Sequence, residues 1–255
     1  MKISGKTDIG NQRSENQDNY RAGREQDDTV WALVCVGMGG ARGGKLASSL
    51  AASQIERVFS GQRSAKLSSQ DLRTLMIQAI AGANTLIYNA SLKDIAMLGM
   101  GTTAVCAVVQ NGYLHYANVG DSRIYLYRNH AFTQLSRDHS MVQELVEQGS
   151  ITEQEAYVHP HKNLITRALG VAETVQADYG ECAAKNGDLI LLCSDGLTNY
   201  VSTEDIIDII EAAPFFNCAE MLIDKALANN GQDNITAVLV QVEETDASAN
   251  GGNNG

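Results

Sequence analysis

Several absences narrow the function of this 255-residue chain. The opening stretch Met1–Lys6 lacks the apolar segment of a secretory signal, and no apolar run approaches the length of a membrane span. Basic residues are few: 19 lysines and arginines against 30 acidic residues give a net charge of −11. That charge disfavours nucleic acid and anionic membranes as partners. We therefore expect a cytoplasmic protein, and we expect it to be a monomer.

The cysteines form no disulfide or metal-binding pattern. There are five of them, an odd number, and none belongs to a CxxC pair. Cys35, Cys106 and Cys193 lie inside apolar runs, and no basic cluster flanks any cysteine. We interpret them as small buried hydrophobic residues in a reducing compartment, not as catalytic thiols.

Short apolar stretches bounded by glycine or asparagine predict β-strands. They are Thr29–Val36, Thr102–Gln110, Tyr113–Val119, Arg123–Arg128, Asp188–Cys193 and Ile235–Val242. Asn111-Gly112 predicts a tight hairpin, and Gly120-Asp121 turns the chain into the next strand. Connections this short make an antiparallel meander and argue against a doubly wound parallel sheet.

Helices are predicted from apolar residues at helical spacing. They cover about Gly44–Phe59, Gln70–Ala90 and Asn217–Asn229, and a further helix ends at Ile210. Ser68 with Asp71, and Ser202 with Asp205, have the spacing of N-terminal caps. Because helix pairs flank the strands in the sequence, we predict an α+β fold of stacked antiparallel sheets flanked by helix pairs.

The chain reads as one domain over residues 1–242, followed by a disordered tail over 243–255 that is rich in glycine and asparagine. Within the domain, residues 138–170 are polar and carry three of the five histidines. Thr152 with Glu155 predicts the cap of a short helix there. We interpret this segment as a mobile excursion of short helices near one edge of the sheets.

Three aspartates stand next to a glycine or an asparagine at the ends of the strand-like runs. They are Asp121 in Gly120-Asp121-Ser122-Arg123, Asp195 in Cys193-Ser194-Asp195-Gly196, and Asp233 in Gln232-Asp233-Asn234. Carboxylates delivered to strand ends by tight turns can gather around Mg²⁺ or Mn²⁺. A single aspartate of this kind is usually only a turn former, so a carboxylate-rich sandwich without metal stays open as an alternative.

Divalent ions held this way lower the pKa of a bound water, and a pair of them suits attack on phosphorus. Such a site also needs a cation that orients the phosphate, and a guanidinium does so with two parallel hydrogen bonds. Arg13, in the polar loop between Gly10 and Asp18, is the candidate.

Six motifs occur in an order that resembles a known family. They are Asn16-Gln17-Asp18, Gly37-Met38-Gly39-Gly40, Gly101-Thr102-Thr103, Gly120-Asp121-Ser122-Arg123, Ser194-Asp195-Gly196-Leu197 and Asp233-Asn234-Ile235-Thr236. This order resembles the metal-dependent PP2C-type (PPM) protein serine/threonine phosphatases, in their compact bacterial branch. The motifs span nearly the whole chain.

The resemblance implies an αββα sandwich that hydrolyses phosphoserine and phosphothreonine with two to three Mg²⁺ or Mn²⁺ ions. By motif position, Asp195 and Asp233 would ligate the first ion, and the carbonyl of Gly37 the second. Asp121, with Asp195, would hold a third. Asp18 would bind metal-bound waters, and Arg13 the substrate phosphate. These are expectations from the family.

The resemblance further implies that residues 138–170, which we call the flap, influence substrate access. It also implies that Asn234 braces the Asp233 turn.

Val36 departs from the pattern, because the family places a metal-bridging aspartate before Gly-Met-Gly-Gly. Valine has no donor atom, so we expect a weakened second metal site and reduced turnover. Val36 is either a replacement that silences an active enzyme or the natural residue of a pseudophosphatase. The other motifs are intact, which favours the first explanation.

We therefore predict a protein serine/threonine phosphatase that acts on phosphorylated proteins, the products of serine/threonine kinases, and that Val36 impairs. The alternative is a catalytically inactive pseudophosphatase that binds phosphoproteins as a regulator. Met38 stands where eukaryotic relatives carry a histidine, so protonation of the leaving oxygen falls to water.

Overall fold

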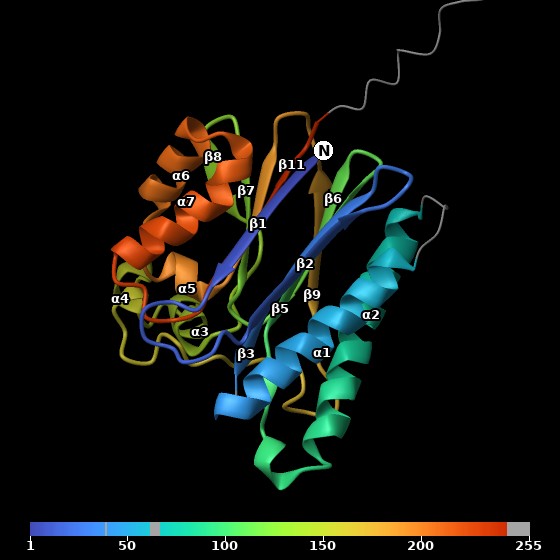
Figure 1. Cartoon of the computed structure of the whole chain (residues 1–255), viewed down its shortest axis with the longest axis vertical. Coiled ribbons are helices and arrows are strands. Elements are labelled where there is room, and N and C mark those ends of the chain that lie inside the picture. The colour runs from blue at the N-terminus through green and yellow to red at the C-terminus, as the bar shows by residue number, and fades with distance from the viewer. Residues whose placement is uncertain (39, 62–66, 244–255) are drawn as a thin grey trace, which may run out of the picture.

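The computed structural model describes residues 1–38, 40–61 and 67–243, so the predicted tail lies almost wholly outside the described residues. Two antiparallel sheets are stacked face to face, with helices on both outer faces (Figure 1). The predicted αββα sandwich of two antiparallel sheets flanked by helix pairs is confirmed.

Every strand pairing is antiparallel. The first sheet has the order β1 (Lys2–Asp8), β11 (Ile235–Gln241), β10 (Leu189–Cys193), β7 (Arg123–Arg128) and β8 (Ala131–Gln134). The second has the order β2 (Asp18–Arg24), β3 (Val30–Met38), β5 (Ala104–Gln110), β6 (Tyr113–Val119) and β9 (Asp178–Ala183), with β4 (Gly101–Thr102) paired to β3.

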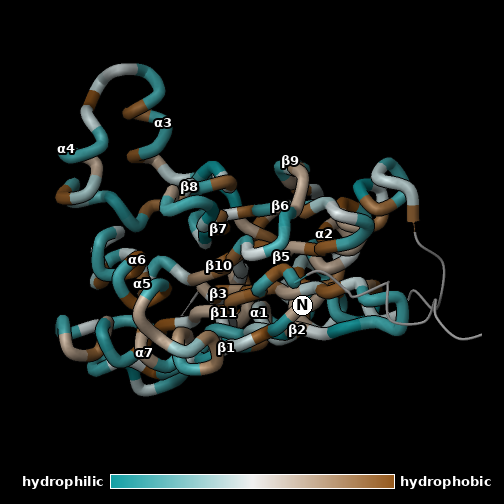
Figure 2. The backbone as a smooth tube through the Cα atoms, turned by 90° about the horizontal axis from the view of Figure 1, so that it is seen from above, coloured by the Kyte–Doolittle hydropathy of each residue, from teal (hydrophilic) through white to brown (hydrophobic). Residues whose placement is uncertain are grey.

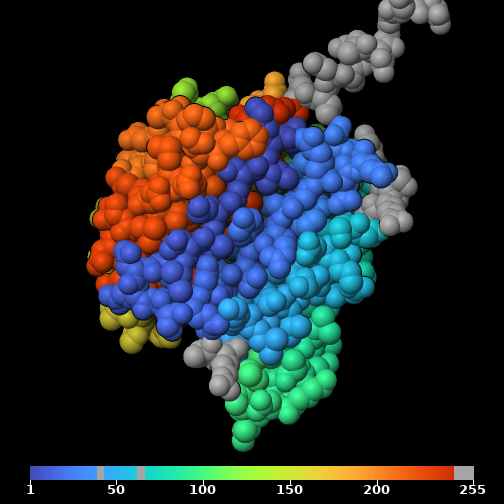
Figure 3. Space-filling model, in the orientation of Figure 1, coloured from blue at the N-terminus to red at the C-terminus, as the bar shows by residue number. Residues whose placement is uncertain are grey.

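Helices α1 (Gly40–Ser60) and α2 (Ser69–Ser91) cover the second sheet, and α6 (Thr203–Ala212) and α7 (Phe215–Ala228) cover the first. The space-filling view shows these two pairs on opposite sides, with the N-terminal residues between them (Figure 3). The remaining helices are short. They are η1 (Ile95–Met97), α3 (Met141–Glu147), α4 (Glu153–Tyr157) and α5 (Asp195–Thr198).

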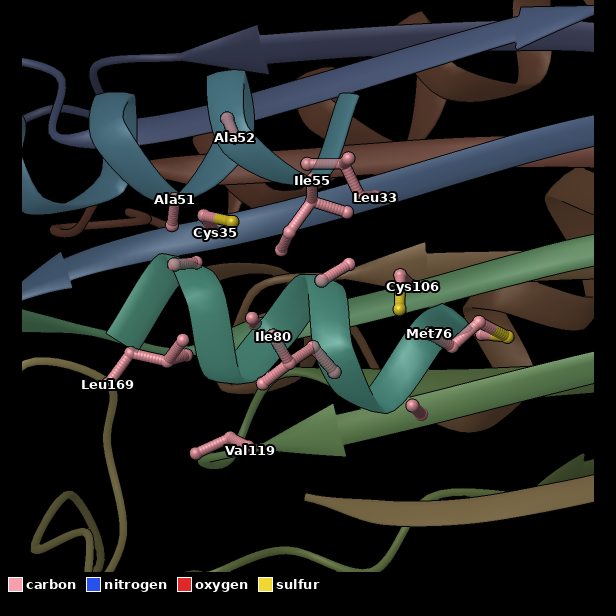
Figure 4. Close-up of a cluster of buried hydrophobic side chains, with 14 of the residues drawn as sticks. Leu33, Cys35, Ala51, Ala52, Ile55, Met76, Ile80, Cys106, Val119 and Leu169 are labelled. Carbon is pink, nitrogen blue, oxygen red and sulfur yellow. The ribbon is translucent and has the colours of Figure 1, made fainter. Parts of the chain in front are cut away.

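Apolar side chains fill the three spaces between the four layers. The layer between α1, α2 and the second sheet contains Cys35 and Cys106, which lie among Leu33, Ile55 and Ile80 (Figure 4). The prediction that these two cysteines are small buried hydrophobic residues is confirmed. All five cysteines lie in the described part of the chain and are free.

The local sequence signals account for most of the boundaries. Ser68 and Ser202 cap α2 and α6, as predicted. The side chain of each serine accepts a hydrogen bond from the backbone amide three residues later, that of Asp71 or Asp205. Asn111 and Gly112 both have positive φ, +52° and +76°, which a two-residue hairpin of the expected type requires. The predicted strand Thr102–Gln110 is wrong in one respect, because it is divided at Thr103 between β4 and β5.

The flap contains α3 and α4, which stand out from the rest of the chain when the molecule is viewed along its length (Figure 2). Its two ends are joined at the base: Ser140 bridges Ile165, and the amide of Thr166 donates to the carbonyl of His139. The predicted short helices are therefore present. Across the described ranges, no helix has both the length and the apolar character needed to cross a membrane.

Candidate metal centre

The residues singled out from the sequence converge on one pocket of about 500 Å³ at an edge of the two sheets. Its lining includes Arg13, Val36, Gly37, Asp121, Asp195 and Asp233. Asp18 lies behind this lining, buried in β2. The structure thus brings together side chains that are up to 220 positions apart in the sequence.

Three adjacent strands of the first sheet deliver the aspartates. Asp121 lies in the turn before β7, Asp195 follows β10, and Asp233 precedes β11. Because β10 pairs with both β7 and β11, the three carboxylates meet at the same edge. The Asp195 turn also requires Gly196, since a Cβ there would lie 2.0 Å from the carbonyl oxygen of Asn234.

The second sheet contributes Val36 and Gly37 at the end of β3. Thr103 holds this end in place: its hydroxyl accepts the amide of Val36 at 3.0 Å, and its own amide donates to the Val36 carbonyl at 2.9 Å. Gly37 allows α1 to approach, since a Cβ there would lie 2.2 Å from the carbonyl oxygen of Gly44.

Asp18 has an unsatisfied oxygen. Its Oδ2 accepts the hydroxyl of Thr236 at 2.7 Å, whereas its Oδ1 has no hydrogen-bond partner among the described residues. Burial, together with the negative charges of Asp195 and Asp233, raises the pKa of Asp18 to about 7. An unpaired buried carboxylate oxygen of this kind suits a water or a cation.

Asp195 and Asp121 are only partly compensated, because the charge of Arg123 opposes the effects of burial and repulsion without cancelling them. Burial, and then the charge of Asp233, raises the pKa of Asp195, while burial and then the charge of Asp195 raise the pKa of Asp121 well above its usual range. The neutral amide of Asn199 is one partner of Asp195, at 3.2 Å. A divalent cation would relieve this repulsion, so the hard oxygen donors fit Mg²⁺ or Mn²⁺.

The fit is incomplete. Within residues 1–38, 40–61 and 67–243, no group of three or more histidine, cysteine, aspartate or glutamate residues is placed to hold a metal ion. Among the lining residues, Asp195 could share one ion with Asp233 and another with Asp121. The side chain of Val36 has no donor atom. The donor set therefore fits a first ion better than a second.

Arg13 lies in the pocket but is paired with a predicted metal ligand. Its Nε is 2.8 Å from Oδ1 of Asp233, and its Nη2 donates to Oδ2 at 2.9 Å. The side chains are 57% and 36% exposed, so the ion pair is weak, within about 1 kcal/mol. A phosphate or a cation can replace either partner at low cost.

Contacts that the sequence did not reveal fix the Asp121 turn. His139, at the base of the flap, accepts the amide of Gly120 through Nδ1 at 3.1 Å and donates its own amide to the Gly120 carbonyl at 2.9 Å. The hydroxyls of Thr103 and Ser122 lie 2.7 Å apart. The turn is therefore held from both the flap and the second sheet.

Two further lining residues, Asn163 and Ile165, come from the flap. Neither belongs to a motif, and their place in the site depends on how the flap folds back across the sheets. Asn234 braces the Asp233 turn, since its side chain accepts the amide of Gln17 and donates to the carbonyls of Ile9 and Glu15.

This geometry agrees with comparisons with known proteins. Residues 5–239 match the family model described as Protein phosphatase 2C. The chain belongs to the protein phosphatase 2C family. Curated relatives include the serine/threonine phosphatase stp of Listeria monocytogenes serotype 4b, 37% identical over 94% of this chain and 95% of the relative. The protein phosphatase PhpP of Streptococcus pneumoniae is 36% identical over 97% and 100%.

Solved phosphatase structures share the fold. The serine/threonine phosphatase of S. agalactiae superposes with a TM-score of 0.88 and 35% identity, covering 95% of this chain and 99% of that one. The catalytic domain of the serine/threonine protein phosphatase PstP, solved with two manganese ions, gives a TM-score of 0.83 and 31% identity over 95% and 98%. Metal dependence is therefore a property of the family to which this 2C-type chain belongs.

Proposed function

We propose that this chain hydrolyses phosphoserine and phosphothreonine in proteins with the help of Mg²⁺ or Mn²⁺. The observation that carries the proposal is the convergence of Asp121, Asp195 and Asp233 on one pocket that also contains Arg13. The names of the relatives, which are protein phosphatases and include serine/threonine and 2C-type ones, support the same reaction.

Each residue has a distinct part in this proposal. Asp195 and Asp233 would hold the first ion. The carbonyl of Gly37 would bind the second ion, and Asp121 with Asp195 would hold a third. A bound ion supplies charge compensation for phosphate and makes water more acidic. Arg13 leaves Asp233 to bind two phosphate oxygens, because its planar guanidinium matches them.

Asp18 receives protons from, or shares them with, waters in the pocket through its unpaired Oδ1. Thr103, Ser122 and His139 keep the two strand ends in register, which fixes the distance between the carboxylates of the two halves of the site. Small displacements of such groups lower the rate of the reaction strongly.

Val36 limits this activity in the proposal. Without a carboxylate at this position the second ion has one carbonyl and water as donors, too little charge for tight binding. Among the described residues, no three acidic, histidine or cysteine side chains are placed to hold one ion together, and this favours a second candidate: a pseudophosphatase that binds phosphoproteins without hydrolysing them. In both candidates the partners are phosphoproteins made by serine/threonine kinases. We also propose a monomer in the cytoplasm.

The test is release of inorganic phosphate from a phosphothreonine peptide, measured with Mn²⁺ and with a chelator. We expect slow, Mn²⁺-dependent release that Asp233→Asn abolishes, with Asp224→Asn, a change on the outer helix α7, as the matched control. A chain that releases no phosphate but binds the peptide is the pseudophosphatase. A chain that neither binds nor cleaves it contradicts both candidates.

A further inference from the structure

A second and larger pocket, of about 730 Å³, lies between the flap and the body of the protein. Its flap side is formed by α3 and α4, and its body side by β7, β8, α5, α6 and the residues between the last two. None of the six motifs explains it, because most of its lining comes from residues outside them. Its volume is within the range of ordinary ligand pockets.

This flap pocket opens directly into the metal pocket. Asp121, Asn163 and Asp195 line both of them. A phosphorylated side chain that reaches the three aspartates therefore has its own neighbouring residues at the mouth of the flap pocket. Asn163 lies on the shared border, and its exposed amide can both donate to and accept from a peptide main chain.

Apolar side chains from both walls form part of the flap-pocket lining. Val142 and Val146, one turn apart on α3, line the pocket from the flap, and Phe132 and Ile206 line it from the body. Phe132 stacks on Tyr125 with ring centroids 4.4 Å apart and an interplanar angle of 11°, which makes a rigid floor.

The flap helices do not bury this apolar face by themselves. Neither α3 nor α4, both described in full, contains a buried residue. Figure 2 shows both helices set off from the body beyond β7 and β8. Val142, Val146 and Ala156 are half-buried and line the space, so an apolar group that entered it would remove their remaining surface from water.

Two cations, Arg123 and Lys162, line the pocket. Arg123 makes hydrogen bonds of 2.7 to 3.1 Å to both carboxylate oxygens of Asp138. The ammonium of Lys162 lies 5.0 Å from the ring centroid of Tyr157 at the rim. The Arg123 guanidinium is therefore engaged and does not serve a second phosphate, and the apolar side chains of the lining are groups that can select a flanking residue.

We propose that the flap pocket binds an apolar side chain that flanks the phosphorylated residue of the substrate, while Asn163 holds the peptide main chain between the two pockets. The chain then selects phosphoproteins with a leucine-like or phenylalanine-like residue near the phosphorylation site. This inference rests on the proposed function, because it assumes that the metal pocket holds the phosphorylated residue.

The test uses two fluorescent peptides that carry a non-hydrolysable phosphonate in place of phosphothreonine. They differ only in the flanking positions, which are leucine in one and serine in the other. Fluorescence anisotropy with Mn²⁺ should show at least about tenfold tighter binding of the leucine peptide, the gain expected from burying one such side chain.

Two matched variants localise the effect. Val146→Glu places a charge inside the pocket and should remove most of the preference for the leucine peptide. Val158→Glu makes the same change on the same flap, at a side chain that is 76% exposed and outside the pocket lining, and should leave the preference intact. Circular dichroism and the affinity for the serine peptide check that both variants are folded.

The outcomes separate the two hypotheses. Equal binding of both peptides, or equal effects of the two variants, overturns the flap-pocket proposal and leaves the phosphatase proposal standing. Equally tight binding of an unphosphorylated leucine peptide also overturns it, because the site would then serve a different protein partner. If neither phosphonate peptide binds and inorganic phosphate does not bind either, the phosphatase proposal fails with it.

Discussion

Asp18 and Val36 are direct cross-strand partners in the ladder between β2 and β3. Opposed residues of an antiparallel pair project to the same face of the sheet, so the two side chains are neighbours. Asp18 carries the one buried side-chain oxygen that has no partner among the described residues. A carboxylate at position 36, which the resemblance to the family implies, would therefore stand beside an aspartate that already lacks a partner.

Introducing such a carboxylate with Val36→Asp should raise Mn²⁺-dependent phosphatase activity by about 10²–10³-fold, the equivalent of ~3–4 kcal/mol of transition-state stabilisation. Phosphate release from p-nitrophenyl phosphate measures it. Val36→Asn is the matched control, because asparagine has the shape of aspartate without its charge. Unchanged activity in Val36→Asp, with Mn²⁺ bound, would show that position 36 does not limit this chain.

The same variant should be less stable without metal and should respond more strongly to metal than the parent. A further negative charge beside Asp18 increases repulsion, so Val36→Asp should have a lower Tm than the parent in a chelator. With Mn²⁺ the rise in Tm should be larger than in the parent, because ligand binding stabilises the folded state by mass action. Thermal unfolding under the two conditions decides this without any activity measurement.

Arg13→Ala should weaken phosphate binding while leaving the fold intact. The ion pair with Asp233 is exposed and contributes within about 1 kcal/mol, so the free energy of unfolding should change little. Inhibition by inorganic phosphate should weaken about tenfold or more, since a charge-assisted bidentate contact is lost. Arg57→Ala on α1, an arginine hydrogen-bonded to Gln54 and away from the pocket, should leave the inhibition constant unchanged.

Thr103→Val should destabilise the protein by about 2 kcal/mol, because it leaves the Val36 amide and the Ser122 hydroxyl without their buried partner. Valine has nearly the same shape, so the loss reports the hydrogen bonds. Thr85→Val on α2, where the hydroxyl is exposed and bonds the Ala81 carbonyl, is the control and should change stability by less than about 0.5 kcal/mol. Urea unfolding curves give both values.

The central strands could be predicted from the sequence, but four others could not. The strands β1, β2, β8 and β9 are absent from the predicted set, and each of them is the edge of a sheet. The central strands β5 and β10 are buried along their whole length and read as apolar runs, whereas β1 has no buried residue. Edge strands face water on one side, so their sequences resemble loops.

The site shows a similar division. Asp121, Asp195 and Asp233 could be identified because a short turn and a neighbouring apolar run mark each of them in the sequence. His139 and Asn163 carry no such local signal, because their roles come from contacts between the flap and turns far away in the chain. Roles that depend on long-range contacts can be assigned only when the fold is known. Aspartates at strand ends can be identified from the sequence.

Asn84 is another residue whose role depends on long-range contacts. It lies within a helix that periodicity predicts, yet its buried amide accepts the Gly170 amide at 2.8 Å and donates to the carbonyls of Ala172 and Glu173. Asn84→Leu should therefore destabilise the protein by about 2–4 kcal/mol, since buried backbone groups lose their partners. Hydrogen exchange should show faster exchange of the Gly170 amide. Unchanged protection there would mean that the loop after the flap is held by other contacts.

His115 should make a contribution to stability that is lost as pH falls below 6.5. Burial lowers the pKa of His115 below its usual 6.5, and the nearby carboxylate of Glu181 opposes this only in part. The imidazole also lies 2.7 Å from the hydroxyl of Tyr179, whose ring faces Arg73. Because the unfolded chain binds a proton at His115 more readily than the folded one, its contribution is present above pH 6.5 and is lost as pH falls through the lowered pKa.

His115→Gln should flatten that part of the pH profile. Urea unfolding at pH 7.5 and pH 5.5 should show that the drop in pH changes the free energy of unfolding less unfavourably in the variant than in the parent. The buried aspartates of the metal pocket have raised pKa values and act in the opposite direction, but both proteins carry them, so the difference between the two profiles isolates His115. A variant whose profile is as steep as the parent's would place the acid sensitivity elsewhere, with His139 as the next buried histidine to replace, because burial lowers its pKa as well.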